Sequence, residues 1–404
     1  MAHEVTYAHS QLAGAPVLTG QAGSLATILD AVLCDGWGTK TIASIVVAAG
    51  VATVTFSGTQ TFEPDVAIEI IGVATPGALN GRQRAISTGT NSVSFATSAP
   101  DGTATLSTAT VKNASLGWTK LFTGTNTRAY KSANSASTGM VLYLNDTGTT
   151  SGRVLGYEGM TDISTGRFPF PLSGWIDGGL FWSKSATANA TARRWLIVGD
   201  DRTFFFCSAP GTSIYNYTVH GFGDLIATRP NDPYACALSG HFAESSGLNG
   251  YPLGCVAISD RTNAQSRGVF VPRLHNGMGA SINCQTFGAG QVAAWAAAPQ
   301  TYSGMAGYGI GQFPHVPDNA LILNRAMVVG PTGQLATGAG HIRGYWPGIL
   351  HAAQDVAGNN FFNLNIKVDG QGDFTGRVLM HERPGQPSGA GMGSVFFDVT
   401  GPWR

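Results

Sequence analysis

Charged side chains are scarce in this sequence of 404 residues. Asp, Glu, Lys and Arg together make up 11% of it, whereas an average soluble domain contains about 25%. The 23 basic residues balance the 23 acidic residues and form no basic run, so the electrostatic pattern of nucleic-acid binding is missing. Because a surface without net charge favours association, the composition predicts a protein covered by neighbouring subunits in an assembly.

Long apolar runs are missing as well. No stretch reaches the ~18 uninterrupted apolar residues of a membrane-crossing helix, so we expect no membrane insertion. The N-terminal residues MAHEVTYAHS show no basic segment followed by an apolar run, so we expect no signal peptide.

Cysteines are few and far apart. An odd number without any CxxC pair argues against a disulfide framework and against a zinc site. We therefore expect buried, reduced thiols in a protein made in a cytoplasm. The five residues are Cys34, Cys207, Cys236, Cys255 and Cys284.

The motifs of common catalytic and cofactor sites are also absent. The sequence contains no HExxH, no phosphate-binding loop and no GxSxG. The glycine-rich residues 307–314 lack the spacing and the βαβ context of a dinucleotide site. We therefore expect a protein that is not an enzyme and that binds no cofactor and no metal.

Two acidic pairs remain candidates for glycan cleavage, because the carboxylates of a glycosidase can come from distant strands. They are Asp200 with Asp201, and Glu158 with Asp162. The glycine-rich turn around the first pair also has a simpler interpretation, since Asp in such a turn usually accepts hydrogen bonds from nearby backbone amides. The same holds for Asp224. His241 and Glu244 lie three residues apart, and we interpret them as parts of a surface loop rather than as a ligand pair.

A single segment has a convincing helix pattern. Ser24 is predicted to cap its N-terminus and Gly36 to end it, and the apolar face between them comprises Leu25, Ile28, Leu29 and Val32. A weaker candidate, residues 290–299, ends at a proline. Elsewhere short Val-, Ile- and Thr-rich strands alternate with Gly, Asp and Pro turns. Residues 193–209 look like a hairpin around Gly199-Asp200-Asp201-Arg202. The pattern predicts a mostly-β fold of sandwich or barrel type.

Residues 41–115 form a run of strands of about the size of a small immunoglobulin-like β domain. Its ends must lie close together if the host domain continues on both sides, and insertion at an exposed loop then costs little. We therefore divide the chain into 1–40 and 116–240 as host, 41–115 as an inserted β-sandwich, and 241–404 as a C-terminal β-rich region. One longer meander of a single domain is the alternative.

Five segments resemble, in order, a family of structural proteins of tailed bacteriophages. The segments are QLAGAPVLTGQAGSLATILDAVLCDGWGTKT from residue 11, GWTKLFTGTNTRAYKS from 117, LYLNDTG with RVLGYEGMTDISTGRFPFP from 142, FGDLIATRPNDPYACAL from 222 and VFFDVTGPWR from 395. Family members pass almost directly from the Asp-Gly-x-Gly turn to Gly-Trp-Thr, whereas this chain carries the inserted residues between them. The resemblance implies a virion component of the tail or baseplate, and it supplies no catalytic residues.

Aromatic residues beside Pro and Arg are candidate interface residues, because Trp, Tyr and Arg dominate protein–protein hot spots. They are Tyr234, Tyr345, Trp346 and Trp403; the alternative is that they lock their own core. The expected partners are copies of the chain in a trimer or hexamer, other tail or baseplate proteins, and a glycan or protein of the host surface. A receptor-binding tail protein, a head decoration protein and a glycan-degrading tail enzyme remain alternatives.

Overall fold

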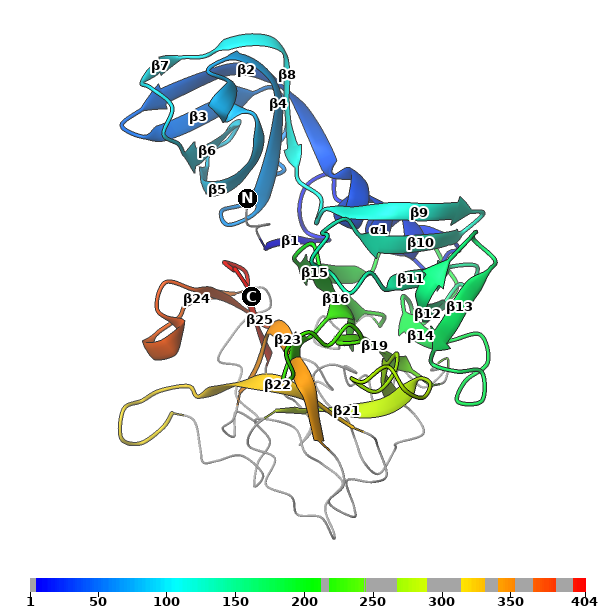
Figure 1. The fold of residues 1–404 in the computed structure, drawn as a ribbon. Helices are drawn as coiled ribbons and strands as arrows, with labels where there is room; N and C mark the ends of the chain where they lie inside the picture. The colour runs from blue at the N-terminus through cyan, green and yellow to red at the C-terminus, as the bar shows by residue number, and fades with distance from the viewer. Residues whose placement is uncertain are drawn as a thin grey trace.

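The computed structural model describes residues 5–211, 218–242, 244, 267–288, 314–330, 341–352, 366–382 and 395–404. Strands dominate these residues, and a single short α-helix accompanies them, so the predicted mostly-β class is confirmed. The strands form two sheets, one of seven strands and one of nineteen. Figure 1 shows the smaller sheet at the top of the molecule and the larger one, the host, below it.

The smaller sheet contains a closed six-stranded barrel. Its strands follow each other around the ring in the order β2, β3, β6, β5, β4 and β8, and β8 pairs again with β2. Their bounds are Trp37–Ala48 (β2), Val51–Phe56 (β3), Ser92–Ala96 (β6), Gly81–Thr88 (β5), Ala67–Thr75 (β4) and Thr105–Asn113 (β8), while β7 (Gly102–Thr103) pairs with β2 and a 3-10 turn covers Gly77–Leu79.

Two shared strands explain why this unit closes instead of staying open as two separate sheets. β2 pairs with β8 through Trp37–Thr41 and with β3 through Ile42–Ala48. β5 pairs with β4 through Gly81–Arg84 and with β6 through Ala85–Thr88, where a bulge lies between Ala85 and Ser87. Strands that change partner at a bulge turn the corners of a barrel. The sequence predicted an immunoglobulin-like unit over 41–115, and the observed barrel strands run from residue 37 to residue 113.

The host sheet is entirely antiparallel in the pairings between its strands. Its strands are β1 (Thr6–His9), β9 (Trp118–Gly124), β10 (Thr127–Ser132), β11 (Val141–Asn145), β12 (Ser151–Met160), β13 (Gly166–Phe170), β14 (Leu180–Ser183), β15 (Arg194–Gly199), β16 (Thr203–Ala209), β17 (Thr218–Asp224), β18 (Ile226–Ala227), β19 (Cys236–His241), β20 (Arg267–Val271), β21 (Ile282–Gly288), β22 (Leu323–Gly330), β23 (His341–Ala352), β24 (Lys367–Asp369), β25 (Val378–Glu382) and β26 (Val395–Asp398), with a 3-10 turn at Gly372–Phe374. The predicted division at residue 240 falls inside β19, which pairs with both β17 and β20.

The hairpin of β15 and β16 is the centre of the host, because both of its faces are buried. Leu196 and Phe205 face one apolar cluster, which also contains residues of β22, β23, β25 and β26. Trp195 and Phe204 face a second cluster, which contains the helix and residues of β10–β12. Strands covered on both faces read as continuous apolar runs, which is the pattern of WLIV and FFFC in this hairpin.

The helix α1 (Ser24–Leu29) continues as a π-helical turn, Asp30–Asp35, and ends at Gly36 with φ 71°. Its predicted apolar face is buried, as expected. The predicted cap is wrong: Ser24 donates its hydroxyl to Thr19 O, and Gly23 precedes the helix without a side-chain cap. Asp146, from the segment after β11, accepts the amides of Leu25 and Ala26 instead. The candidate helix 290–299 lies outside the described residues.

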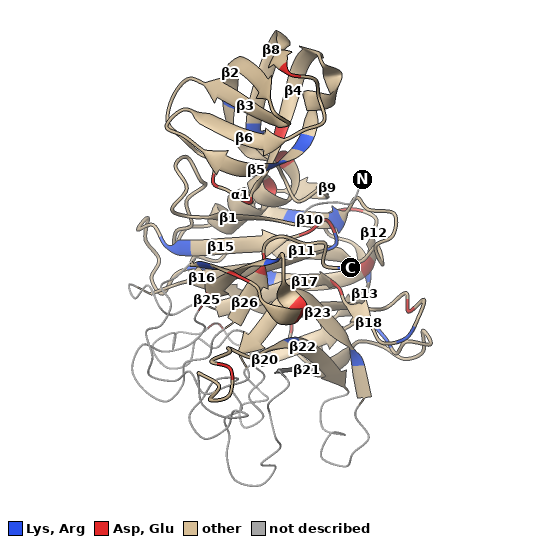
Figure 2. Ribbon diagram, turned by 90° about the vertical axis from the view of Figure 1, so that its left-hand side faces the viewer, with Lys and Arg blue, Asp and Glu red and all other residues tan. Residues whose placement is uncertain are grey.

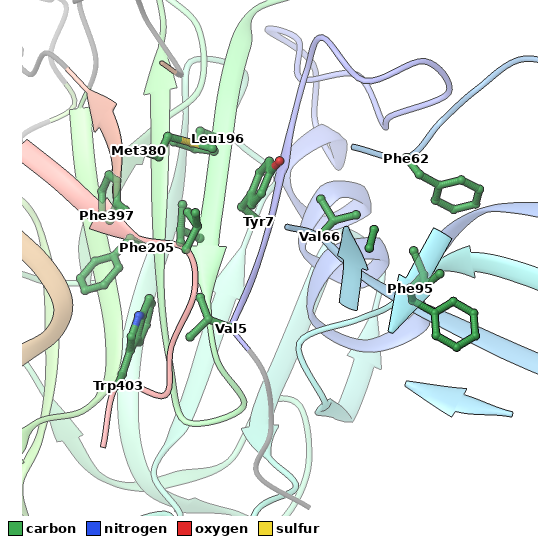
Figure 3. Close-up of a cluster of buried hydrophobic side chains, with 14 of the residues drawn as sticks. Val5, Tyr7, Phe62, Val66, Phe95, Leu196, Phe205, Met380, Phe397 and Trp403 are labelled. Carbon is green, nitrogen blue, oxygen red and sulfur yellow. The ribbon is translucent and has the colours of Figure 1, made fainter. Parts of the chain in front are cut away.

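The barrel rests on the host through apolar and polar contacts. Figure 3 shows Val66, Phe62 and Phe95 of the barrel region on one side of Tyr7 of the host, and Phe205 and Trp403 on the other. Arg84 of β5 donates hydrogen bonds to Val399 O (2.9 Å) and Thr400 O (2.6 Å) beyond the last host strand. The barrel and the host therefore share one buried cluster.

The two ends of the barrel segment lie side by side at its base. Leu116 N donates to Val32 O at 2.8 Å, and Lys120 Nζ lies 2.6 Å from Asp35 Oδ2.

Figure 2 shows acidic and basic residues interspersed over the ribbon. In this view the described residues show no large area of only positive or only negative charge.

Candidate functional site

A cavity of about 550 Å³ opens beside the C-terminal residue, and we call it the C-terminal pocket. It is formed by the loop between β10 and β11, the turn between β15 and β16, and the segment around β18. Its lining residues are Ala136, Ser137, Thr138, Arg202, Leu225, Ile226, Ala227, Asn231, Asp232, Pro233, Ala235 and Arg404. The lining thus combines polar and charged residues with apolar ones.

Asp224 accepts hydrogen bonds from several residues that line this pocket. Arg202 Nε donates to its Oδ2 at 2.8 Å, and Thr138 donates its hydroxyl to Oδ1 at 2.6 Å. Arg404 donates to the main-chain oxygen of Asp224 at 2.7 Å and pairs with Asp200. Burial lowers the pKa of the Arg404 guanidinium. These groups bind one another, so the pocket presents paired charges.

Asp200 and Asp201 lie in the turn between β15 and β16. Asp200 Oδ1 accepts the amides of Arg202 (2.8 Å) and Thr203 (2.7 Å), and Asp201 accepts a hydrogen bond from Asn134. Burial raises the pKa of the Asp200 carboxyl, and Arg404 opposes that effect. A raised carboxyl pKa is a common property of general acids. Here, however, both oxygens have structural partners, as the interpretation as a turn predicts.

Glu158 and Asp162 have separate environments. Glu158 in β12 forms a two-point ion pair with Arg273, in which Nη2 lies 3.0 Å from Oε2. Asp162 is in the exposed turn before β13 and accepts the amide of Ser164 at 2.7 Å. Glu158 therefore connects β12 to the loop after β20, whereas Asp162 stabilises its own turn.

The four aromatic candidates divide into two groups. Trp346 and Trp403 are only 1% and 8% exposed, and both rings surround Phe205, with centroid distances of 5.7 Å and 5.9 Å. These two residues lock the core, which was the alternative interpretation, because side chains buried in this way offer no contact area to another chain. Tyr234 and Tyr345 are half-buried.

His241 and Glu244 also act separately. The interpretation of His241 as part of a surface loop is wrong, because His241 is buried in β19 with its ring 5.2 Å from that of His220. Glu244 accepts hydrogen bonds from the hydroxyls of Thr150 and Ser151. In the described part of the chain no three His, Cys, Asp or Glu residues gather as metal ligands would. Cys34, Cys207, Cys236 and Cys284 carry free thiols, and Cys255 lies outside the described residues.

Sequence reasoning missed the partner of Glu158. Arg273 comes from the loop after β20, 115 residues away, and its guanidinium lies 4.1 Å from the ring centroid of Phe168 and 5.5 Å from that of Tyr234. No motif in the sequence connects these residues, because the contact depends on the pairing of distant strands.

No protein-family model matches the chain, and neither does any curated protein. Within the described ranges, none of the helices is both long and apolar enough to span a membrane.

Proposed function

We propose that this protein is a structural component of a tailed-bacteriophage virion, placed at the tail tip or baseplate. It acts through contacts with copies of itself and with neighbouring subunits. The observation that carries the proposal is the ordered resemblance of residues 10–40, 116–170, 204–240 and 340–404 to that family. The same resemblance leaves out residues 41–114, which form most of the barrel.

The geometry at the base of the barrel supports this proposal. The segments DGWG and GWTK, which the family joins almost directly, are adjacent here through the Leu116–Val32 hydrogen bond and the Lys120–Asp35 ion pair. A host of the family's kind can therefore carry the barrel as an addition on its surface. Such a module projects from the particle and extends what the subunit can contact.

The surface of the barrel favours association. Val46, Ile71 and Ile86 are 45–54% exposed on three different strands. With a net charge of zero for the chain, little electrostatic repulsion opposes contact. Weak contacts of this kind gain strength when symmetry repeats them, because each additional contact within a ring forms at a high effective concentration.

The proposal is tested by locating the protein in purified particles. We expect peptides of this chain in the mass spectrum of mature virions at a few to a dozen copies per particle. We also expect its density in the tail region of an electron cryomicroscopy map. Hundreds of copies on the head would indicate head decoration, and complete absence from mature particles would refute the proposal.

A further inference from the structure

Two aromatic side chains of the host are exposed although their positions are fixed. Phe168 in β13 is 56% exposed and Trp175 in the following loop is 51% exposed. Trp175 packs edge-on against Phe270, with a centroid distance of 5.9 Å. Trp175 thus packs on β20, and Phe168 packs on Arg273 in the loop that directly follows this strand. We call these two rings, with Tyr234 and the Glu158–Arg273 pair, the Phe168 surface.

The ion pair at the centre of this surface is held rigidly. Arg273 stacks on Phe168 and reaches toward Tyr234, and it donates from two nitrogens to Glu158 and from Nη1 to Gly277 O at 3.3 Å. An arginine has five N–H donors and a carboxylate has about four acceptor positions. These three bonds therefore leave about two donors on Arg273 and about two acceptor positions on Glu158.

Phe168 keeps an unfavourable backbone conformation to present its ring. Its φ is 51°, in the left-handed region that bulky residues rarely adopt. The neighbouring pairs Tyr157–Pro169 and Gly159–Arg167 fix the strand on both sides. Burial does not compensate this strain, because more than half of the side chain is exposed. Strained residues that persist in this way are typical of ligand-binding positions.

We propose that the Phe168 surface binds an uncharged, hydroxyl-rich glycan. The C–H face of a sugar ring carries partial positive charge and stacks on the negative face of an aromatic ring. Sugar hydroxyls both donate and accept, so they complement the donors left on Arg273 and the acceptor positions left on Glu158. The pair is neutral as a whole, which gives an anionic glycan no net attraction.

A protein partner fits this surface less well. The side chains of Glu158 and Arg273 are only 12% and 18% exposed, and a protein partner would remove the water that still hydrates them. Glycan hydroxyls can replace that water, because they both donate and accept hydrogen bonds. The inference deepens the proposed function by giving the virion subunit a class of ligand on the bacterial cell surface, and it rests on that function.

The full-length protein is tested on an array of defined bacterial surface oligosaccharides, neutral and charged, followed by calorimetric titration of the neutral glycan bound best. Phe168→Gly removes the ring while glycine readily adopts the left-handed conformation. Glu158→Gln removes the negative charge of the ion pair, and Trp175→Ala removes the second exposed ring. We expect each variant to weaken binding on the order of tenfold or more. Ile71→Ala, a change of an exposed apolar residue on the barrel, should bind like the unaltered protein.

Three results would overturn the inference: no neutral glycan bound on the array, binding to charged glycans alone, or equal binding by Phe168→Gly and the unaltered protein. Concentration-dependent dimers that Phe168→Gly abolishes, without glycan binding, would assign the surface to a second copy of the chain and also overturn it. The particle experiment separates the two proposals. Protein found in tails without glycan binding contradicts this inference alone, and glycan binding by a protein absent from particles contradicts the virion role.

Discussion

Lys184 and Asp146 form an ion pair in which both side chains are 0% exposed. Lys184 Nζ also donates to Gln21 O (2.9 Å) and Gly148 O (2.7 Å), while Asp146 accepts two amides at the start of α1. All of these groups are therefore satisfied without water. A buried pair of this kind adds little net stability, but removing one partner leaves an uncompensated charge.

Lys184→Met should destabilise the protein by about 3–5 kcal/mol, because it leaves Asp146 charged in the interior. Urea unfolding measures the change. Glu69→Gln is the control, since the ion pair of Glu69 with Lys112 is 38% and 26% exposed and should contribute ~1 kcal/mol or less. Equal losses in the two variants would show that the buried pair has no special role in holding α1.

His220 predicts a pH dependence of stability. Its ring is buried between Trp182 and Phe206, and burial, with a smaller effect of His241, lowers its pKa well below the usual value. The unfolded chain therefore binds a proton that the folded chain does not. The free energy of unfolding should fall as the pH drops below about 6.5, by up to ~1.4 kcal/mol per unit.

His220→Phe keeps the aromatic stack and removes the titrating group. Urea titrations at pH 7, 6 and 5 should show a shallower loss of stability in this variant than in the unaltered protein. Ile71→Ala changes an exposed side chain of the barrel that does not titrate, and it should retain the original slope. If His220→Phe left the slope of stability against pH unchanged, His220 would not be the source of this pH dependence.

At the scale of elements, β23 depends on a glycine under the C-terminal tryptophan. A Cβ at Gly348, whose φ is 69°, would lie 1.9 Å from Trp403 Cε2. Trp403 packs there against Phe205 and donates its indole N–H to Asp398 O at 2.8 Å. The final residues thus close the core around Phe205.

Gly348→Ala should cost about 2–4 kcal/mol, because the clash adds to the left-handed strain. Tryptophan fluorescence should shift to the red as Trp403 becomes exposed, and the melting temperature should fall. Gly376→Ala isolates the strain alone, since Gly376 has φ 80° and nothing within 4 Å of an added Cβ. The clash would be disproved if both variants lost the same stability without a spectral shift.

The elements themselves differ in how far the sequence predicts them. The apolar face of α1 and the β15–β16 hairpin follow from local patterns, because periodicity and turn residues lie within one segment. The cap of α1 does not, since Asp146 is 121 residues from Leu25. The sequence also left open whether Trp346 and Trp403 belong to an interface or to the core, because their burial depends on Phe205, and the neighbouring Pro and Arg residues say nothing about that ring.

At the scale of the whole molecule, the closed barrel and the Phe168 surface depend on strand pairing. The change of partners along β2 and β5 closes the barrel, and a sequence pattern does not reveal where a strand changes partner. Arg273 meets Glu158 and Phe168 for the same reason. Strand content was thus predictable from the residues, whereas the site that combines three strand regions was not.

Arg84→Gln should loosen the barrel from the host. The guanidinium donates to several backbone oxygens, those of Val5, Asp65, Val399 and Thr400, and glutamine cannot reach them all. Hydrogen exchange should accelerate in peptides covering residues 5–9 and 395–404 and stay slow in β3 and β6. Glu69→Gln, on the outer surface of the barrel, should leave both regions unchanged. Unaltered exchange at residues 395–404 in Arg84→Gln would contradict the anchoring role.

The anchoring of Arg84 also sets a time order during synthesis. Its partner Val399 is 315 residues further along the chain, and a ribosome adds about 5–20 residues each second. The barrel, whose strands are nearly contiguous in sequence, can therefore fold roughly 15–60 s before Val399 and Thr400 are synthesised. During that interval Arg84 lacks these two partners, and the buried cluster around Phe62 and Val66 still lacks the residues of the last host strands.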